Sequence, residues 1–182
     1  MNIIPALQTG MQVVVYAPHA AREESAVLAA QLALRGQVTI LDGGNRFQAY
    51  RVAHLIRRHT VDVSTAANHL FVRRAFTCYQ MLALLENTPS LKQSHLVLDL
   101  LGTFYDDHIS VHEAGRLLEA CLRQLERLQR LAPVAITLAP SPVEERAFLV
   151  EQLCARADQL FTLEMPVSQV HQPSLFSLDT SN

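Results

Sequence analysis

Short apolar runs alternate along the chain with longer segments in which apolar residues recur every three or four positions. The runs predict buried strands at residues 11–16, 37–42, 69–72, 95–100, 134–139 and 159–163. The longer segments predict helices at residues 22–34, 47–59, 77–86, 111–131 and 142–156. This alternation favours an α/β fold, with a mostly parallel central sheet of about six strands and helices on both faces.

Two of the predicted helices carry start signals in the sequence. Ser110 precedes the helix at 111–131 as an N-cap, and Glu113 completes a capping box with it. Ser141 followed by Pro142 predicts the start of the helix at 142–156, because proline is favoured at the first helical position.

The composition narrows the class of protein. The 182 residues, 18% of them charged with a formal net charge of −2, fit one domain. A protein that holds nucleic acid mainly by charge is usually strongly basic, so we expect any contact with DNA to be indirect. No apolar run approaches the ~18 residues that span a bilayer, which argues against a membrane protein. The isolated Cys78, Cys121 and Cys154 are expected to be reduced, buried thiols in a cytoplasmic protein.

We expect three parts along the chain. Residues 1–10 form an N-terminal extension, and residues 11–164 form the core domain. Residues 165–182 are expected to be a flexible C-terminal tail, because that stretch is rich in polar residues and contains two prolines.

Ligands of such sheets bind beside the carboxyl ends of the strands, so a phosphate-binding loop is expected after the first strand. A working loop has the form GxxxxGK[ST], whose glycines and lysine surround the phosphates. Residues 17–25 contain neither glycine nor lysine, while Glu23 and Glu24 add negative charge that repels a polyphosphate. Arg22 is the residue available to replace the lysine.

Two further loops at this edge carry candidate chemistry. The fourth predicted strand leads into Asp99, a pattern typical of a Walker B strand, whose carboxylate organises magnesium. After the second strand, residues 42–46 read Asp-Gly-Gly-Asn-Arg. This loop is either a binding loop, with Asp42 and Arg46 as its polar groups, or a tight turn, and we favour the turn.

Taken in order, these segments resemble the ATPase core of the RecA/RadA recombinase superfamily. Residues 39–47 (TILDGGNRF) resemble the family's YIDTEGTF segment, and residues 71–77 (FVRRAFT) resemble its ARAFNT segment. Residues 96–105 (LVLDLLGTFY) resemble its Walker B strand, LLIVDSATALYR, and residues 134–139 its next strand. The resemblance covers about residues 11–164 and implies a three-layer RecA-like fold. It also implies that Arg22, Ser25, Asp42 and Asp99 are remnants of a nucleotide site.

The chain departs from the family where catalysis is concerned. The phosphate-binding loop is lost, and the family's catalytic glutamate is absent near Gly43 and Gly44. Residues 140–158, where the recombinases carry a DNA-binding loop, predict a compact acidic helix. No oligomerisation segment of the FxxA type precedes Met11. We therefore expect no catalytic residue and no cofactor.

The resemblance implies a non-catalytic RecA-like accessory protein in DNA repair or recombination that acts through protein contacts. Recombinase paralogues and the bacterial SulA and ImuA types are comparable members of the superfamily. One alternative is a divergent nucleotide-binding ATPase, with Asp99 on magnesium and Arg22 or Arg46 on phosphate. Another is a SulA-like inhibitor of cell division. The expected partners are a RecA-like relative or the bacterial sliding clamp.

Basic and acidic clusters elsewhere are weaker candidates. Arg73 and Arg74, with aromatic neighbours, are candidate DNA contacts, although a strand end with Phe76 in the core is favoured. A second cluster holds five potential metal ligands: Asp106, Asp107, His108, His112 and Glu113. We expect that cluster to be a solvated loop and helix start, without a metal.

The tail contains a short motif, Gln172-Pro173-Ser174-Leu175-Phe176, which resembles the clamp-binding pentapeptide QL[SD]LF. In such a motif Leu175 and Phe176 would anchor in an apolar pocket while Gln172 fixes the register by hydrogen bonds. The alternative is a tail that docks the two apolar residues on its own core.

Overall fold

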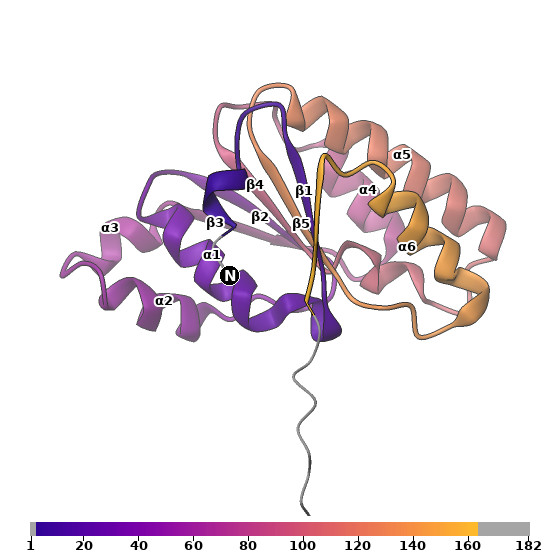
Figure 1. Ribbon diagram of the computed structural model, residues 1–182, viewed down its shortest axis with the longest axis horizontal. Coiled ribbons are helices and arrows are strands. Elements are labelled where there is room, and N and C mark those ends of the chain that lie inside the picture. The colour runs from indigo at the N-terminus through magenta and orange to yellow at the C-terminus, as the bar shows by residue number, and fades with distance from the viewer. Residues whose placement is uncertain (1–2, 164–182) are drawn as a thin grey trace, which may run out of the picture.

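The computed structural model describes residues 3–163, which form one α/β unit (Figure 1). Its strands are β1 (Gln12–Tyr16), β2 (Val38–Asp42), β3 (Leu70–Arg74), β4 (Ser94–Leu98), β5 (Val134–Leu138) and β6 (Gln159–Thr162). Its α-helices are α1 (Arg22–Ala33), α2 (Ala49–Arg57), α3 (Val63–Ala67), α4 (Cys78–Glu86), α5 (Val111–Gln129) and α6 (Ala147–Cys154). Short 3₁₀ turns are η1 (Ile4–Ala6), η2 (Pro18–Ala21), η3 (Leu100–Phe104) and η4 (Glu144–Arg146).

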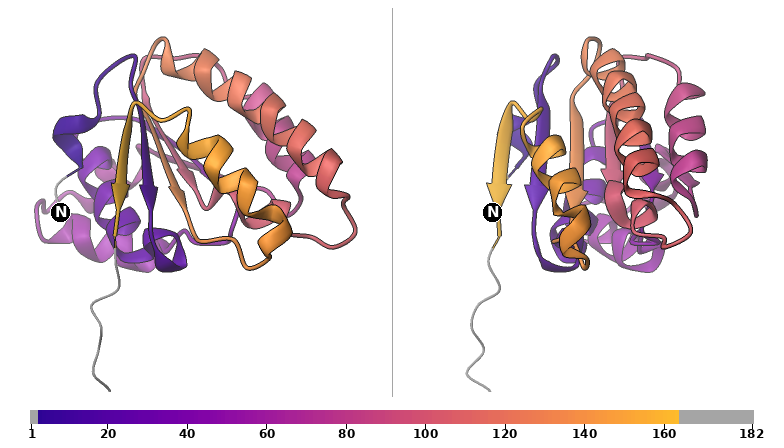
Figure 2. Two further views of the ribbon diagram at one scale, coloured as in Figure 1. Left: turned by 45° about the vertical axis from the view of Figure 1, so that its right-hand side comes forward. Right: turned by 90° about the vertical axis from the view of Figure 1, so that its right-hand side faces the viewer.

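The strands form one sheet in the order β3-β2-β4-β5-β1-β6, and every neighbouring pair is parallel. Connections toward β3 and connections back toward β6 run in opposite directions, and right-handed crossovers therefore place their helices on opposite faces. Figures 1 and 2 show α1, α2 and α3 on one side of the sheet and α4, α5 and α6 on the other. The predicted α/β fold, with helices on both faces, is confirmed.

Each face of the sheet has its own apolar core. In β2, Ile40 packs with α1 and α2, whereas Leu41 packs with α4 and α5. This alternation follows from the two-residue repeat of a strand, and it explains why the central strands are mostly apolar. The buried carboxylates Asp42 and Asp99 lie at the carboxyl ends of β2 and β4.

Several predicted boundaries are wrong. The last helix begins at Ala147, because the Ser141 hydroxyl binds Val143 in a turn and η4 intervenes before the helix. The helix α3 was not predicted, and it is only five residues long. β3 runs on to Arg74, and Asp99 lies beyond the end of β4, where its φ of 49° turns the chain.

The described residues before β1 lie against the core. Ile3 and Ile4 are 5% and 8% exposed, and the backbone N–H of Gly10 donates to the Gln129 carbonyl at the end of α5.

Within residues 3–163, none of the helices combines the length and the apolar character needed to cross a lipid bilayer.

His95 is a buried imidazole near the amino end of β4. The side chain is 1% exposed, and neither ring nitrogen has a hydrogen-bond partner among the described residues. Burial, together with the charge of the nearby Arg127 guanidinium, lowers the pKa of His95 to about 4. The folded protein therefore keeps this ring neutral at pH values where the unfolded chain takes up a proton.

We predict that folding stability falls as the pH drops from about 6.5 to about 4, because only the unfolded chain binds this proton in that range. The loss amounts to about 3 kcal/mol from this residue when fully developed. Urea unfolding of His95→Leu should show a correspondingly weaker pH dependence than the wild type. The exposed His59→Leu is the control, and an equal change in both variants would contradict the assignment.

Candidate functional site at the carboxyl edge

Asp42 ends β2 as a fully buried carboxylate that organises the loop after it. One of its oxygens accepts from the backbone N–H of Arg46 at 2.8 Å, and the other accepts from the N–H of Phe47 at 3.1 Å. The second oxygen also meets Nε of Arg74, from the end of β3, at 3.2 Å. The loop 42–46 is thus a turn closed on Asp42.

Asp99 lies beside this turn, at the end of the neighbouring strand β4. The residue is 2% exposed, and its backbone N–H donates to the Thr137 hydroxyl of β5 at 3.1 Å. Its carboxylate oxygen Oδ2 lies 2.7 Å from Nε of Arg46. The structure therefore brings Asp42 and Asp99 together, as neighbours of the same arginine.

Arg46 joins the two loops through two different groups. Its backbone N–H binds Asp42, while its guanidinium binds Asp99 and is one-third exposed. With Arg74 on Asp42, two buried carboxylates are balanced by two guanidinium groups. Such pairing offsets the cost of burying the carboxylates, which is several kcal/mol for an unpaired ion.

Close approach of the loops requires glycine. A Cβ built on Gly44 would lie 2.2 Å from Oδ2 of Asp99, and one on Gly43 would lie 2.8 Å from the Asp99 carbonyl oxygen. No side chain fits at either distance. The double glycine in the loop 42–46 is therefore explained by the packing of Asp99, without a bound ligand.

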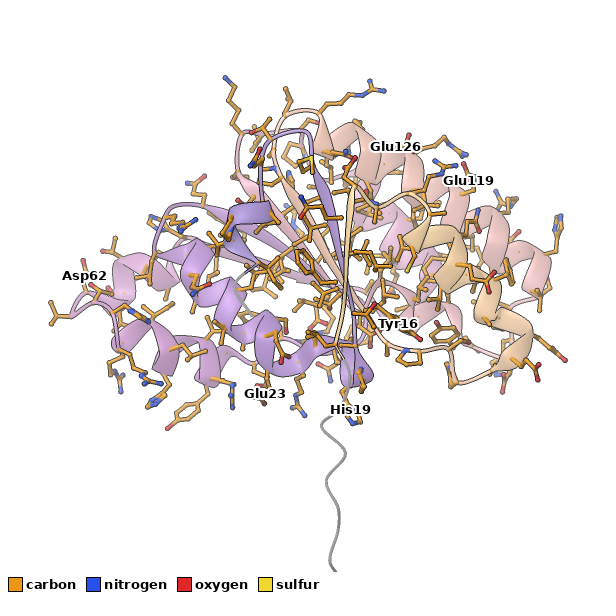
Figure 3. The ribbon with its side chains drawn as sticks, viewed as in Figure 1. Tyr16, His19, Glu23, Asp62, Glu119 and Glu126 are labelled. Atoms are coloured by element: carbon orange, nitrogen blue, oxygen red, sulfur yellow. The ribbon has the colours of Figure 1, made fainter. Side chains whose placement is uncertain are left out.

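The loop after β1 differs in shape and in charge from a phosphate-binding loop. His19, Ala20 and Ala21 all have left-handed φ values between 50° and 54°, a conformation that residues other than glycine rarely adopt in succession. Figure 3 shows Tyr16, His19 and Glu23 around the end of β1 and the start of α1. Glu23 forms an ion pair with Arg51 of α2, which keeps a carboxylate at the helix start.

Arg22 and Ser25 do not reach the two carboxylates by any described contact. The Arg22 guanidinium lies against the side-chain amide of Gln48, whose oxygen faces it in the orientation that satisfies both groups. The buried Ser25 hydroxyl donates to the Arg22 carbonyl at 3.0 Å, within its own helix. In this structure Asp42, Asp99 and Arg22 already contact protein groups, and Glu23 and Glu24 place negative charge at the start of α1.

The basic pair at the end of β3 divides between two environments. Arg74 binds Asp42, whereas Arg73 is exposed and forms no ion pair within the described residues. The favoured placement of Phe76 in the core is wrong, because its side chain is 71% exposed. Cys78 and Met81 of α4 take the buried positions instead, and the Gln80 side chain holds the Phe76 N–H at 2.8 Å.

The acidic residues of the cluster after β4 form hydrogen bonds and ion pairs within this chain. Asp106 accepts from the backbone N–H of His108, and Glu113 binds Arg116 and the Tyr79 hydroxyl. Ser110 caps α5 by accepting from the Glu113 N–H at 3.1 Å, as predicted. No group of three potential ligands gathers to hold a metal within residues 3–163. The motif Gln172–Phe176 lies outside the described residues.

Two features of the loops beyond the carboxyl ends of the strands could not be predicted from the sequence. Arg146 is 5% exposed and donates to the carbonyls of Phe104 and Ile109, which ties η4 to the loop after β4. Burial raises the pKa of Tyr105 to about 12; the Asp99 carboxylate acts in the same direction, and the neighbouring Ser141 side chain acts against it. The phenol is therefore uncharged, and it cannot act as a base at neutral pH.

We predict that Arg46→Met destabilises the protein by about 2 kcal/mol, because it leaves the Asp99 carboxylate buried without its counter-ion. In an Asp99→Asn background the same substitution should cost less than about 1 kcal/mol, since no charge is left unpaired. Urea unfolding of the four proteins measures the coupling. Equal costs in both backgrounds would show that the ion pair is not the source of the loss.

The sequence was compared with protein-family models and with curated protein sequences, and neither comparison gives a match. The functional assignment consequently rests on the residues and on the geometry of this edge.

Proposed function

We propose that the protein is a non-catalytic RecA-like accessory protein of DNA repair or recombination that acts through contacts with other proteins. One observation carries the non-catalytic part: Arg46 and Arg74 already neutralise Asp42 and Asp99, the carboxylates that would organise a metal. The link to repair and recombination comes from the resemblance of residues 11–164 to the RecA/RadA superfamily. Any contact with DNA is expected to be indirect.

A surface suited to a protein partner lies on β3, α4 and the loop that follows. Its exposed apolar side chains are Phe71, Val72, Phe76, Tyr79 and Leu91, with exposed fractions between 38% and 71%. We call this set the β3–α4 face. Phe71 and Val72 point to opposite sides of the sheet, because successive side chains of a strand alternate, so the set borders β3 on both sides. Exposed apolar side chains grouped on neighbouring elements are typical of interaction sites.

The backbone of β3 adds to this surface, because within residues 3–163 β3 is an edge strand that pairs with β2 alone. The Val38 N–H donates to the His69 carbonyl, and the Ala75 N–H donates to the Asp42 carbonyl. Odd-numbered residues of this segment thus face β2, and the backbone groups of Leu70, Val72 and Arg74 point away from the sheet. An open edge of this type accepts a strand from a partner.

The proposed partners are those expected from the two sequence resemblances, that of the core and that of the tail motif. A RecA-like relative is the candidate for the β3–α4 face. The bacterial sliding clamp is the candidate for the tail motif, with Leu175 and Phe176 as anchors. The alternative of a divergent ATPase would require either Arg22 to leave Gln48 or Arg46 to leave Asp99.

We predict that magnesium and ATP do not raise the melting temperature of the protein. A nucleotide present at 100 times its dissociation constant would stabilise the fold by about 2.7 kcal/mol, which is a shift of several degrees. Differential scanning fluorimetry with and without Mg·ATP measures this. A clear upward shift that is lost in Asp99→Asn would favour the ATPase alternative over our proposal.

We predict that Val72→Lys weakens binding to a RecA-type recombinase of the same organism at least tenfold. A lysine on an open edge strand opposes pairing with a further strand, because its charge would have to be desolvated. Val61→Lys is the matched control, since Val61 is fully exposed and lies outside the β3–α4 face. Biolayer interferometry gives the affinities. Absence of binding by the wild type, or equal losses in both variants, would contradict the proposed surface.

A further inference from the structure

Two neighbouring hollows begin at the amino ends of β2 and β4, continue along the edge strand β3 and together form one groove. The first, of about 510 Å³, is lined by residues that include Leu7, Arg35, Gln37, Leu91, Lys92 and Gln93. The second, of about 470 Å³, is lined by residues that include Gln37, Phe71, Arg73, Thr88, Leu91 and Gln93. The two share Gln37, Leu91 and Gln93, so we treat them together as the amino-edge groove.

The charges along this groove are all of one sign. Arg35, Lys92 and Arg73 line it, and no aspartate or glutamate is among the residues that line either hollow. None of the three cations forms an ion pair within residues 3–163. By contrast, Arg46, Arg74 and Arg156 each have a carboxylate partner. The groove therefore presents positive charge that the described part of the chain leaves uncompensated.

One of these cations has a second explanation. Arg35 comes two residues after the end of α1, where a positive charge is favourable to the helix dipole. Lys92 lies in a loop before β4, and Arg73 lies on the edge strand, so neither owes its place to a helix end. These two residues are the ones that point to an external anion.

The floor and walls of the groove suit an extended chain. Leu7, Leu91 and Phe71 supply apolar surface, and Leu91 and Phe71 are each 47% exposed. Arg127 holds the wall in place by donating to the Thr88 carbonyl at 2.8 Å, and the Gln93 amide donates to the Thr39 hydroxyl at 2.5 Å. A preformed wall reduces the entropy lost when a ligand binds.

We infer that the amino-edge groove binds an extended segment of a partner protein in which apolar and acidic side chains alternate. Carboxylates of such a segment can meet Arg73 and Lys92 while its apolar side chains cover Leu91 and Phe71. The inference rests on the proposed function, because it gives the chemistry of a partner for a protein that acts by contact. The peptide-binding test is separate from the nucleotide test, which concerns Asp99 at the carboxyl end of β4.

The test uses the full chain and two short capped peptides labelled with fluorescein. In one peptide leucine alternates with glutamate, and in the other leucine alternates with lysine. Fluorescence anisotropy should show binding of the glutamate peptide at least tenfold tighter than that of its lysine twin. This difference should shrink several-fold as sodium chloride rises from about 0.05 to about 0.5 M, since salt screens exposed charges.

The double variant Arg73→Glu/Lys92→Glu should bind the glutamate peptide at least tenfold more weakly than the wild type does. It should bind the lysine peptide more tightly. Arg57→Glu is the matched control, because this exposed arginine of α2 lies outside both hollows. The melting temperature of each variant establishes that it is folded. A reversal of preference in the double variant is a readout that simple loss of stability would not produce.

Other occupants give different results, and each would overturn the inference. Equal affinity for both peptides, or unchanged affinity in the double variant, would remove the role of charge. A peptide of residues 165–182 that competes for the groove would identify the chain's own tail as the occupant. A concentration-dependent dimer that the double variant abolishes would identify a second copy. A single-stranded oligonucleotide that needs the same two cations would assign the groove to nucleic acid.

Discussion

The contact of the Arg46 guanidinium with the buried Asp99 carboxylate is the interaction on which the carboxyl edge depends. It joins the loop after β2 to the loop after β4, while the Arg46 backbone keeps Asp42 in the same cluster. The charges of this cluster are thus balanced by groups of the same chain. The glycines of this loop then follow as a packing requirement, since Gly44 leaves room only for the Asp99 oxygen.

The fold was largely predictable because the hydrophobic periodicities of strands and helices are visible within short stretches of sequence. All six strands follow from apolar runs such as residues 134–139, and α5 follows from its stripe and from Ser110. The start of α6 was not predictable from Ser141, because the hydroxyl bonds to its own turn at Val143 instead of to a helix. The five-residue α3 is too short to show a helical repeat.

The site was predictable only in part, because it depends on contacts between distant residues. Asp42 and Asp99 stand out in the sequence as acids that follow apolar strands. That Arg46 binds Asp99, 53 positions away, depends on β2 and β4 being neighbours in the sheet. Phe76 was misplaced for a similar reason, since periodicity does not reveal that β3 lies at the edge, where α4 buries Cys78 and Met81.

The two ends of the sheet differ in where their charges are satisfied. At the carboxyl edge each buried acid has an arginine from the same chain, so binding an external ion there would first require an existing pair to break. Lys92, in the loop before β4, and Arg73, on the edge strand β3, lack an acid within the described residues, so a partner's carboxylate has no internal competitor there. Arg73 lies on the edge strand β3, which also carries the exposed apolar side chains of Phe71 and Val72. This contrast in charge between the two regions is what supports our proposal of recognition by contact.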